Sequence, residues 1–124
     1  MTLVTAIDHV VLTVRDPEAA SVFYGQALGL LTLRFGEGRL ALQVGAQKIN
    51  LQSLGQETRN HAGIGAGDLC LLTERPLDEI RQKLEAAGIA IVEGPVAKSG
   101  ARGPITSIYF TDPDGNLIEV ARYD

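Results

Sequence analysis

The alternation of hydrophobic and polar positions in the first half of the chain predicts a strand, a helix and three further strands. Residues 6–14 are mostly β-branched or apolar, which is typical of a strand. Asp16-Pro17-Glu18 predicts a helix start, because aspartate caps free N–H groups, proline suits the first turn and glutamate favours the positive helix end. Strand patterns follow at residues 31–35, 39–44 and 48–54. Helical spacing up to Gly29 predicts one buried helix face, formed by Ala20, Phe23, Tyr24, Ala27 and Leu28.

The second half repeats this order after a polar, glycine-rich segment at residues 55–67, which we interpret as a linker. Residues 68–73 form a strand pattern, and Pro76 opens a second helix that Gly88 closes. Strand-like runs follow at residues 90–93, 106–111 and 117–122. Between the first two of these runs, residues 94–104 have loop composition and no period, so we expect an irregular insertion there.

A constant spacing between landmarks indicates that the two halves are copies of one unit. Pro17 and Pro76 differ by 59 positions, as do Gly29 and Gly88, and the same offset carries His9 onto Asp68. Asn50 and Glu119, in the last strand of each half, differ by 69 positions, which assigns the ten extra residues to the insertion. We therefore expect one domain over residues 1–124, with one βαβββ module at about 4–54 and a second at 68–124.

Composition narrows the class of protein. A chain of 124 residues with 45% hydrophobic residues can bury a core in one domain. Cys70 is the only cysteine, and a single thiol without a charged, then apolar, leader favours the cytoplasm. No apolar run approaches 18 residues, which argues against a membrane partner. Fifteen acidic residues against eleven basic ones, with few aromatics, argue against a nucleic-acid partner.

Four polar residues at strand positions are candidates for chemistry: His9, Asn50, Asp68 and Glu119. If each module curls into half of a barrel, a pseudo-two-fold axis can bring them to one cavity. An imidazole and two carboxylates there would bind a divalent cation, with oxygen ligands favouring Mn²⁺, Mg²⁺ or Fe²⁺. In the alternative interpretation, His9 is an ordinary strand-end residue and Asp68 a turn-to-strand residue. Asn50 is a poor cation ligand on its own in either interpretation, and we expect it to be a substrate contact, a water anchor or a hydrogen-bonding group within the sheet.

Other polar residues carry weaker signals. His61 lies in the linker, where a solvated side chain is the default and a replacement metal ligand the alternative. Cys70 lies two positions after Asp68 on the same strand, so its side chain could point to the same side of the sheet. We nevertheless expect Cys70 to be a small buried hydrophobe. The turn composition of residues 112–116 places Glu119 well inside the last strand.

Two motifs resemble the vicinal oxygen chelate superfamily, which includes glyoxalase I, fosfomycin-resistance transferases, bleomycin-resistance proteins and extradiol dioxygenases. The first is Ile7-Asp8-His9-Val10-Val11-Leu12-Thr13-Val14, followed by Phe23-Tyr24 and Leu28-Gly29-Leu30. The second is the closing segment from Tyr109 through Asp112-Pro113-Asp114-Gly115-Asn116 to Glu119. The resemblance implies an α+β fold in which two tandem βαβββ modules form a curved, barrel-like mixed sheet. The wider pattern is similar to a subgroup of small glyoxalase-domain proteins.

The resemblance also implies roles for individual residues. His9 and Glu119 match metal ligands of the superfamily, and Asp68 stands where many members carry a second histidine. Asn50 stands where glyoxalase I carries a glutamate, and an amide cannot act as the base that this enzyme needs. The implied cofactor is a divalent metal ion (Mn, Fe, Ni, Mg or Zn). The implied partner is a second copy, in a homodimer whose cavities combine modules of two chains.

We therefore expect a lyase-, isomerase- or dioxygenase-type metalloenzyme that chelates a small substrate through neighbouring oxygens. In this hypothesis Glu119 and Asp68 are catalytic, and Asn50, Arg102 and Tyr109 contact the substrate, with Lys98 beside Arg102 to neutralise an anion. In the alternative interpretation, Arg102 and Lys98 are solvated loop charges and Tyr109 is an aromatic residue packed on its strand. The alternative is a metal-free protein of the bleomycin-resistance type that binds a small molecule without converting it. The metal content of the purified protein discriminates between the two.

Overall fold

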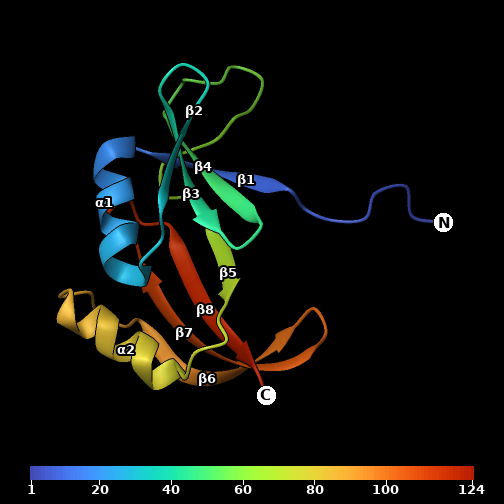
Figure 1. Ribbon diagram of the computed structural model, residues 1–124, viewed down its shortest axis with the longest axis vertical. Helices are drawn as coiled ribbons and strands as arrows, with labels where there is room; N and C mark the ends of the chain where they lie inside the picture. Colours follow the sequence, from blue (N-terminus) through green and yellow to red (C-terminus); the bar gives the residue numbers. More distant parts are fainter.

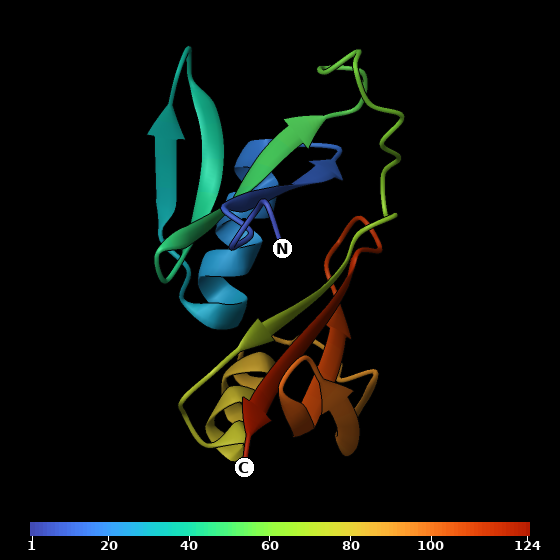
Figure 2. The same ribbon diagram turned by 90° about the vertical axis from the view of Figure 1, so that its right-hand side faces the viewer.

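The computed structural model describes all residues, 1–124, and contains two helices and eight strands in two similar series. Module 1 comprises β1 (His9–Val14), α1 (Pro17–Leu28), β2 (Thr32–Phe35), β3 (Arg39–Val44) and β4 (Gln47–Ser53). Module 2 comprises β5 (Asp68–Leu72), α2 (Leu77–Ala86), β6 (Glu93–Gly100), β7 (Gly103–Thr111) and β8 (Leu117–Tyr123). Figure 2 shows module 1 above module 2, joined by residues 54–67, which form turns and bends.

Strand pairing confirms the α+β fold with two βαβββ modules. Each module is a four-stranded mixed sheet, in the order β1-β4-β3-β2 and β5-β8-β7-β6. The first and last strands of each module run parallel, with Val11 opposite Asn50 in module 1 and Cys70 opposite Glu119 in module 2. These pairs reproduce the offsets of 59 and 69 positions. Asn50 and Glu119 therefore occupy equivalent places in the two sheets.

Residues 94–104 do not form the expected irregular insertion, and that prediction is wrong. They belong to a β-hairpin in which β6 pairs with β7, and the strand expected at 90–93 begins only at Glu93. Because β6 is an edge strand, it tolerates glycine and proline that a central strand would exclude. Gly94 has a φ of 110°, and a Cβ there would collide with the backbone oxygen of Ser107. The glycine that suggested a loop therefore permits the close approach of two strands.

Both helices cover the same side of the molecule, as Figure 1 shows, and they pack their apolar faces against the sheets. A single core of buried residues includes Leu12 and Tyr24 of module 1 together with Leu84, Phe110 and Ile118 of module 2. Phe23 and Phe110 join the modules at a ring-centroid distance of 6.1 Å. The opposite face of each sheet carries no helix, and we call it the open face of that module.

A buried polar cluster also joins the modules. The Tyr24 hydroxyl on α1 donates a 2.7 Å hydrogen bond to Asp112 Oδ2, in the turn between β7 and β8. The Asn116 side chain and the backbone N–H groups of Asp114 and Asn116 donate to the same carboxylate. Burial and the Asp112 carboxylate raise the pKa of the Tyr24 hydroxyl above its usual range, so it stays protonated.

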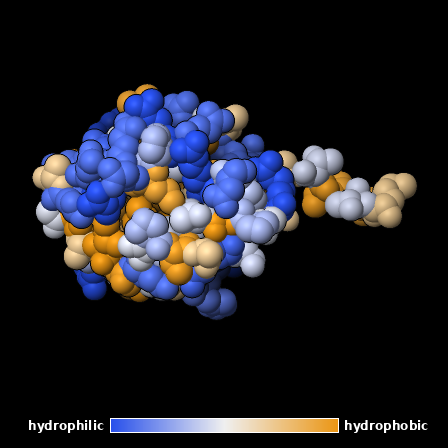
Figure 3. Space-filling model, turned by 90° about the horizontal axis from the view of Figure 1, so that it is seen from below, coloured by the Kyte–Doolittle hydropathy of each residue, from blue (hydrophilic) through white to orange (hydrophobic).

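The first eight residues extend away from both modules as an arm (Figures 1 and 3). The arm exposes the apolar side chains of Leu3, Val4 and Ile7. Neither helix is long and apolar enough to cross a membrane.

Candidate functional site

The open face of module 1 carries polar side chains because strand residues alternate between the two faces of a sheet. Leu12, Ile49 and Leu51 point to the helix side and lie in the core. His9, Asn50 and Gln52 lie on the other side, where they line a pocket of about 410 Å³. The Gln52 side-chain amide donates a 2.8 Å hydrogen bond to the Thr13 hydroxyl on this face. The pocket is completed by Arg39 and by residues of the segment after β4, including Gln56, Glu57 and Arg59.

His9 is the first residue of β1, and its imidazole is oriented by its neighbour in the sequence. The side chain is 45% exposed, and Nδ1 lies 2.8 Å from the Asp8 carboxylate. A carboxylate on one ring nitrogen fixes the orientation of a histidine and leaves the other nitrogen to bind a ligand. Asp8 is not among the predicted functional residues, and its adjacency to His9 is the only signal for it in the sequence.

Asn50 on β4 is the one buried polar side chain with an unpaired atom. Its side chain is 6% exposed, and Oδ1 has no hydrogen-bond partner. Leaving a buried acceptor unpaired costs about 1–3 kcal/mol. The expected alternative of a hydrogen bond within the sheet is therefore not met at this oxygen. Asn50 lies in the pocket lining, where a ligand donor can supply the missing partner.

Glu119 lies at the centre of the open face of module 2. It pairs with Cys70 on β5 and with Tyr109 on β7, and the Ser107 hydroxyl donates a 2.5 Å hydrogen bond to its Oε2. Desolvation first, and the Glu119 carboxylate second, raise the pKa of the Cys70 thiol to about 11. The same two causes raise the pKa of Tyr109 to about 12. Both groups therefore stay protonated at neutral pH beside the carboxylate.

Cys70 and Asp68 share this face. Cys70 is exposed in the single chain, so the expectation of a small buried hydrophobe is wrong. Asp68 is the exposed first residue of β5, two positions before Cys70, and its charge contributes to the raised pKa of the thiol. The open face of module 2 is thus dominated by carboxylates, with Glu93 of β6 opposite Tyr109.

The structure groups the predicted residues by module and does not bring all of them together. Asp68 and Glu119 lie on the open face of module 2, whereas His9 and Asn50 lie on that of module 1. No group of three histidine, cysteine, aspartate or glutamate side chains in the chain could hold a metal ion. One chain therefore does not contain a complete metal centre.

The other predicted residues take part in local contacts. Arg102 is exposed in the turn between β6 and β7, where its guanidinium lies 4.3 Å from the centre of the Tyr123 ring. Lys98 lies 3.8 Å from the Glu93 carboxylate and 5.6 Å from the centre of the Tyr109 ring. His61 is exposed in the segment between the modules.

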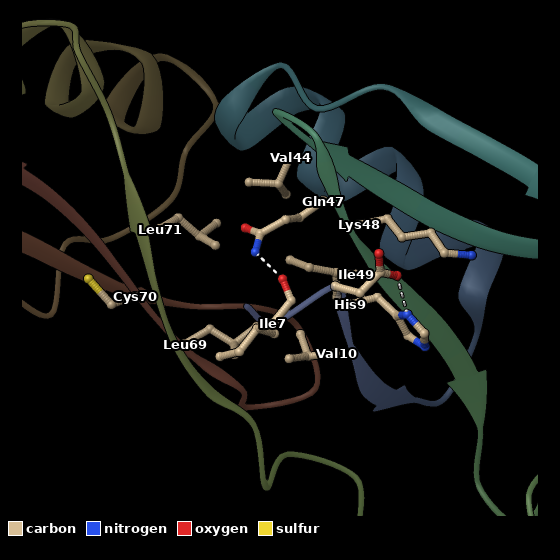
Figure 4. Close-up of a pocket in the computed structure, with 11 residues that line it drawn as sticks. Ile7, His9, Val10, Val44, Gln47, Lys48, Ile49, Leu69, Cys70 and Leu71 are labelled. Carbon is tan, nitrogen blue, oxygen red and sulfur yellow. Dashed lines mark hydrogen bonds and ion pairs between the residues drawn. The ribbon is translucent and has the colours of Figure 1, made fainter. Parts of the chain in front are cut away.

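A smaller pocket of about 160 Å³ lies in the crevice between β1, β4 and β5. Figure 4 shows Val44, Leu69 and Leu71 around it, with the Gln47 amide donating a 2.5 Å hydrogen bond to the Ile7 carbonyl oxygen. His9 borders both this crevice and the larger polar pocket, and Asp8 and Cys70 also line the crevice, whereas Asn50 and Glu119 do not.

Comparison with known proteins identifies the class. Residues 6–120 match the family model described as the glyoxalase/bleomycin resistance protein/dioxygenase superfamily. The chain belongs to this superfamily. This confirms the resemblance of the two sequence motifs.

Similar proteins come from bacteria and a fungus. The chain is 45% identical to virulence protein STM3117 of Salmonella typhimurium over 124 residues, which cover 98% of this chain and 86% of that protein. It is 43% identical to glyoxalase domain-containing protein RDO1 of Mycosarcoma maydis, covering 97% of this chain and 69% of that protein. The solved structure of an integron cassette protein from V. cholerae superposes with a TM-score of 0.94, at 45% identity, covering 100% of this chain and 99% of that chain.

Proposed function

We propose that the protein is a homodimeric metalloenzyme that binds a small substrate with two neighbouring oxygens. Each cavity would form between the open face of module 1 in one copy and the open face of module 2 in the other. The observation that carries this proposal is that His9 and Glu119 lie in different sheets of one chain, and that no three possible ligand side chains of that chain come together. Pairing two copies by a two-fold axis gives both faces a partner at once.

Unused pairing capacity supports a second copy, since β1 and β5 are edge strands. A second copy would also cover the exposed apolar residues of the arm.

The fit of a metal ion depends on this arrangement. The donors of one chain do not suffice, but His9 of one copy and the partner's Glu119 would supply an imidazole and a carboxylate, with the partner's Asp68 as a third ligand. A bound divalent cation would hold the two substrate oxygens and polarise them as a Lewis acid. The Asp8 carboxylate would keep the His9 ring in place, and the Ser107 hydroxyl would orient Glu119. Because Asn50 is neutral, a proton taken from the substrate would go to Asp68 or Glu119.

A second candidate function is metal-free binding of a small molecule in the same cavity. The neutral Asn50 and the lack of three ligands in one chain favour it. In this case His9 and Glu119 would be hydrogen-bonding groups, and the cavity would sequester its ligand without converting it.

The decisive experiment measures bound divalent metal per chain in the protein purified without a chelator or histidine tag. His9→Ala and Glu119→Gln should each abolish stoichiometric binding, whereas the exposed His61→Ala control should bind as the wild type does. Co-expression of the His9→Ala and Glu119→Gln chains should restore binding to about a quarter of the sites, because half of randomly mixed dimers are mixed and each has one intact site of two.

Each outcome has a defined consequence. Absence of recovery in the mixed dimers, when the wild type binds metal, contradicts a cavity shared between copies. Equal loss in the His61→Ala protein would move the metal site to the segment between the modules. A wild-type dimer without stoichiometric metal contradicts the metalloenzyme and leaves the metal-free binding protein.

A further inference from the structure

Two basic side chains on the open face of module 1 contact one aromatic ring. The Arg39 guanidinium carbon lies 4.6 Å from the centre of the Phe35 ring, and the Lys48 ammonium nitrogen lies 3.5 Å from it. Neither side chain takes part in an ion pair, whereas five other arginines of the chain do so.

The Phe35 ring explains how these cations are held, but it does not neutralise them. A cation above an aromatic face is attracted by the negative charge of the ring face. A guanidinium offers paired donors in the geometry of a carboxylate. Arg39 is therefore suited to bind a small carboxylate.

The unpaired oxygen of Asn50 is a second, independent feature of this face. Asn50 pairs with Ala41 on β3, so Arg39, two positions from Ala41, is its diagonal neighbour, roughly 7–8 Å away. Both side chains line the pocket of about 410 Å³. Asn50 is 6% exposed, and a rotation of its amide would present the unpaired oxygen to a ligand. This oxygen can only accept, so the ligand group beside it must carry a donor.

The remaining charges of the pocket leave room for an anion. Glu57 is the carboxylate that lines it, and Arg59 donates to both Glu57 oxygens. This contact lowers the pKa of Glu57 to about 2 and balances its negative charge locally. Arg39 therefore remains as the unpaired charge at the pocket wall.

We propose that the pocket on the open face of module 1 recognises a 2-hydroxycarboxylate, whose carboxylate binds Arg39 and whose hydroxyl donates to Asn50 Oδ1. This assignment rests on the proposed function for its cavity and names the substrate class. A 2-hydroxycarboxylate carries the two neighbouring oxygens that the proposed metalloenzyme requires. Recognition through Arg39 and Asn50 needs no metal ion, so it can be measured separately.

Calorimetric titration of the metal-stripped protein in a chelator tests the proposal with three matched probes. Mandelate carries the carboxylate and the hydroxyl, phenylacetate lacks the hydroxyl, and mandelamide lacks the charge. Mandelate should bind saturably, with a dissociation constant in the millimolar range or below. Each of the other two probes should bind about tenfold more weakly, since each loses one hydrogen-bonded anchor.

Substitutions assign each anchor to its residue. Arg39→Gln should weaken mandelate binding about tenfold and leave mandelamide binding unchanged. Asn50→Leu should remove the preference for mandelate over phenylacetate, and Asn50→Ser provides a smaller change if the leucine variant is unfolded. Arg34→Gln is the matched control, because Arg34 is an exposed arginine that pairs with Glu18 on α1. Circular dichroism verifies the fold of each variant.

Equal affinity for mandelate and mandelamide, or unchanged mandelate binding in Arg39→Gln, would overturn the assignment. So would a lack of saturable mandelate binding. If mandelate selectivity holds but mixed His9→Ala and Glu119→Gln dimers recover no metal site, only the proposed function fails. If the metal site recovers and mandelate selectivity is absent, only the 2-hydroxycarboxylate assignment fails.

Discussion

Modules 1 and 2 share one topology but stabilise their helices in different ways. In α1, four residues are buried, and the Asp16 side chain accepts hydrogen bonds from the N–H groups of Glu18 and Ala19. In α2, only Leu84 is buried, and Pro76 at its N-terminus provides no side-chain cap. Exposed ion pairs surround α2 instead, between Arg75 and Glu79 and from Arg81 to Asp78 and Glu85. Helix α1 is therefore fixed by burial and capping, whereas α2 depends on a single deeply buried side chain.

The open faces differ as much as the helices do. Asn50 and Glu119 occupy equivalent positions, yet one is a buried amide and the other a half-buried carboxylate. The neighbours diverge as well, because Ala41 lies beside Asn50 where Tyr109 lies beside Glu119. The helix-facing sides of both sheets remain apolar. The core thus preserves the repeat, whereas the open faces of the two modules differ in their chemistry.

The largest effect is expected where the two modules meet, at Asp112. Asp112→Ala removes the acceptor of the Tyr24 hydroxyl, the Asn116 amide and two backbone N–H groups. Each buried donor left without a partner costs about 1–3 kcal/mol, and this substitution leaves several of them unpaired. Urea denaturation should show this loss in the free energy of unfolding, and Tyr24→Phe should show a smaller loss of about 1–3 kcal/mol.

The control for this prediction is the exposed Asp78→Ala in α2, whose unfolding should be close to that of the wild type. Two separate unfolding transitions in the Asp112→Ala protein would mean that the cluster holds two independently stable modules together. Wild-type stability in that protein would contradict the view that the Asp112 cluster stabilises the junction of the two modules.

Much of the fold could be predicted because the sequence marks it locally. Asp16-Pro17 and Gly29 bound α1, which runs from Pro17 to Leu28 with a left-handed Gly29 after it. The offset of 59 positions also predicted the equivalence of the two modules. The hairpin of β6 and β7 was not predicted, because Gly94 and Pro95 have loop composition. Within a sheet these residues are compatible only with an edge strand. Which strand lies at an edge is a property of the sheet, not of local sequence.

The candidate site was harder to predict because it depends on contacts distant in the sequence. His9, Asn50 and Glu119 stood out as polar residues in apolar strands, and their roles as ligands remain predictions. The cluster of Arg39 and Lys48 on Phe35 left no such signal, since each is an ordinary residue in its own strand. The unpaired oxygen of Asn50 could not be inferred either, because hydrogen-bond partners are defined only by the folded structure.

A smaller effect is expected at the N-terminus of α1, where the modules differ in capping. Asp16→Ala removes the acceptor for the N–H groups of Glu18 and Ala19, at 3.0 and 3.4 Å. Loss of an N-cap side chain costs about 1 kcal/mol. Denaturation in urea should show this decrease, and Asp16→Asn, which keeps an acceptor, should restore most of it. A decrease of the same size in both variants would assign the effect to charge and not to the cap.

The smallest effect is expected from the ion pairs of α2. Arg75 donates to both oxygens of Glu79 one turn along the helix, at 2.7 to 3.2 Å, and both side chains are largely exposed. Solvent and salt screen such pairs, and holding two long side chains together offsets their attraction. Arg75→Gln should therefore leave the melting temperature unchanged within error, both at low and at high salt. A clear decrease in melting temperature at low salt that disappears at high salt would show that α2 relies on its surface charges. That result would contradict the conclusion that α2, unlike the capped α1, is only weakly anchored.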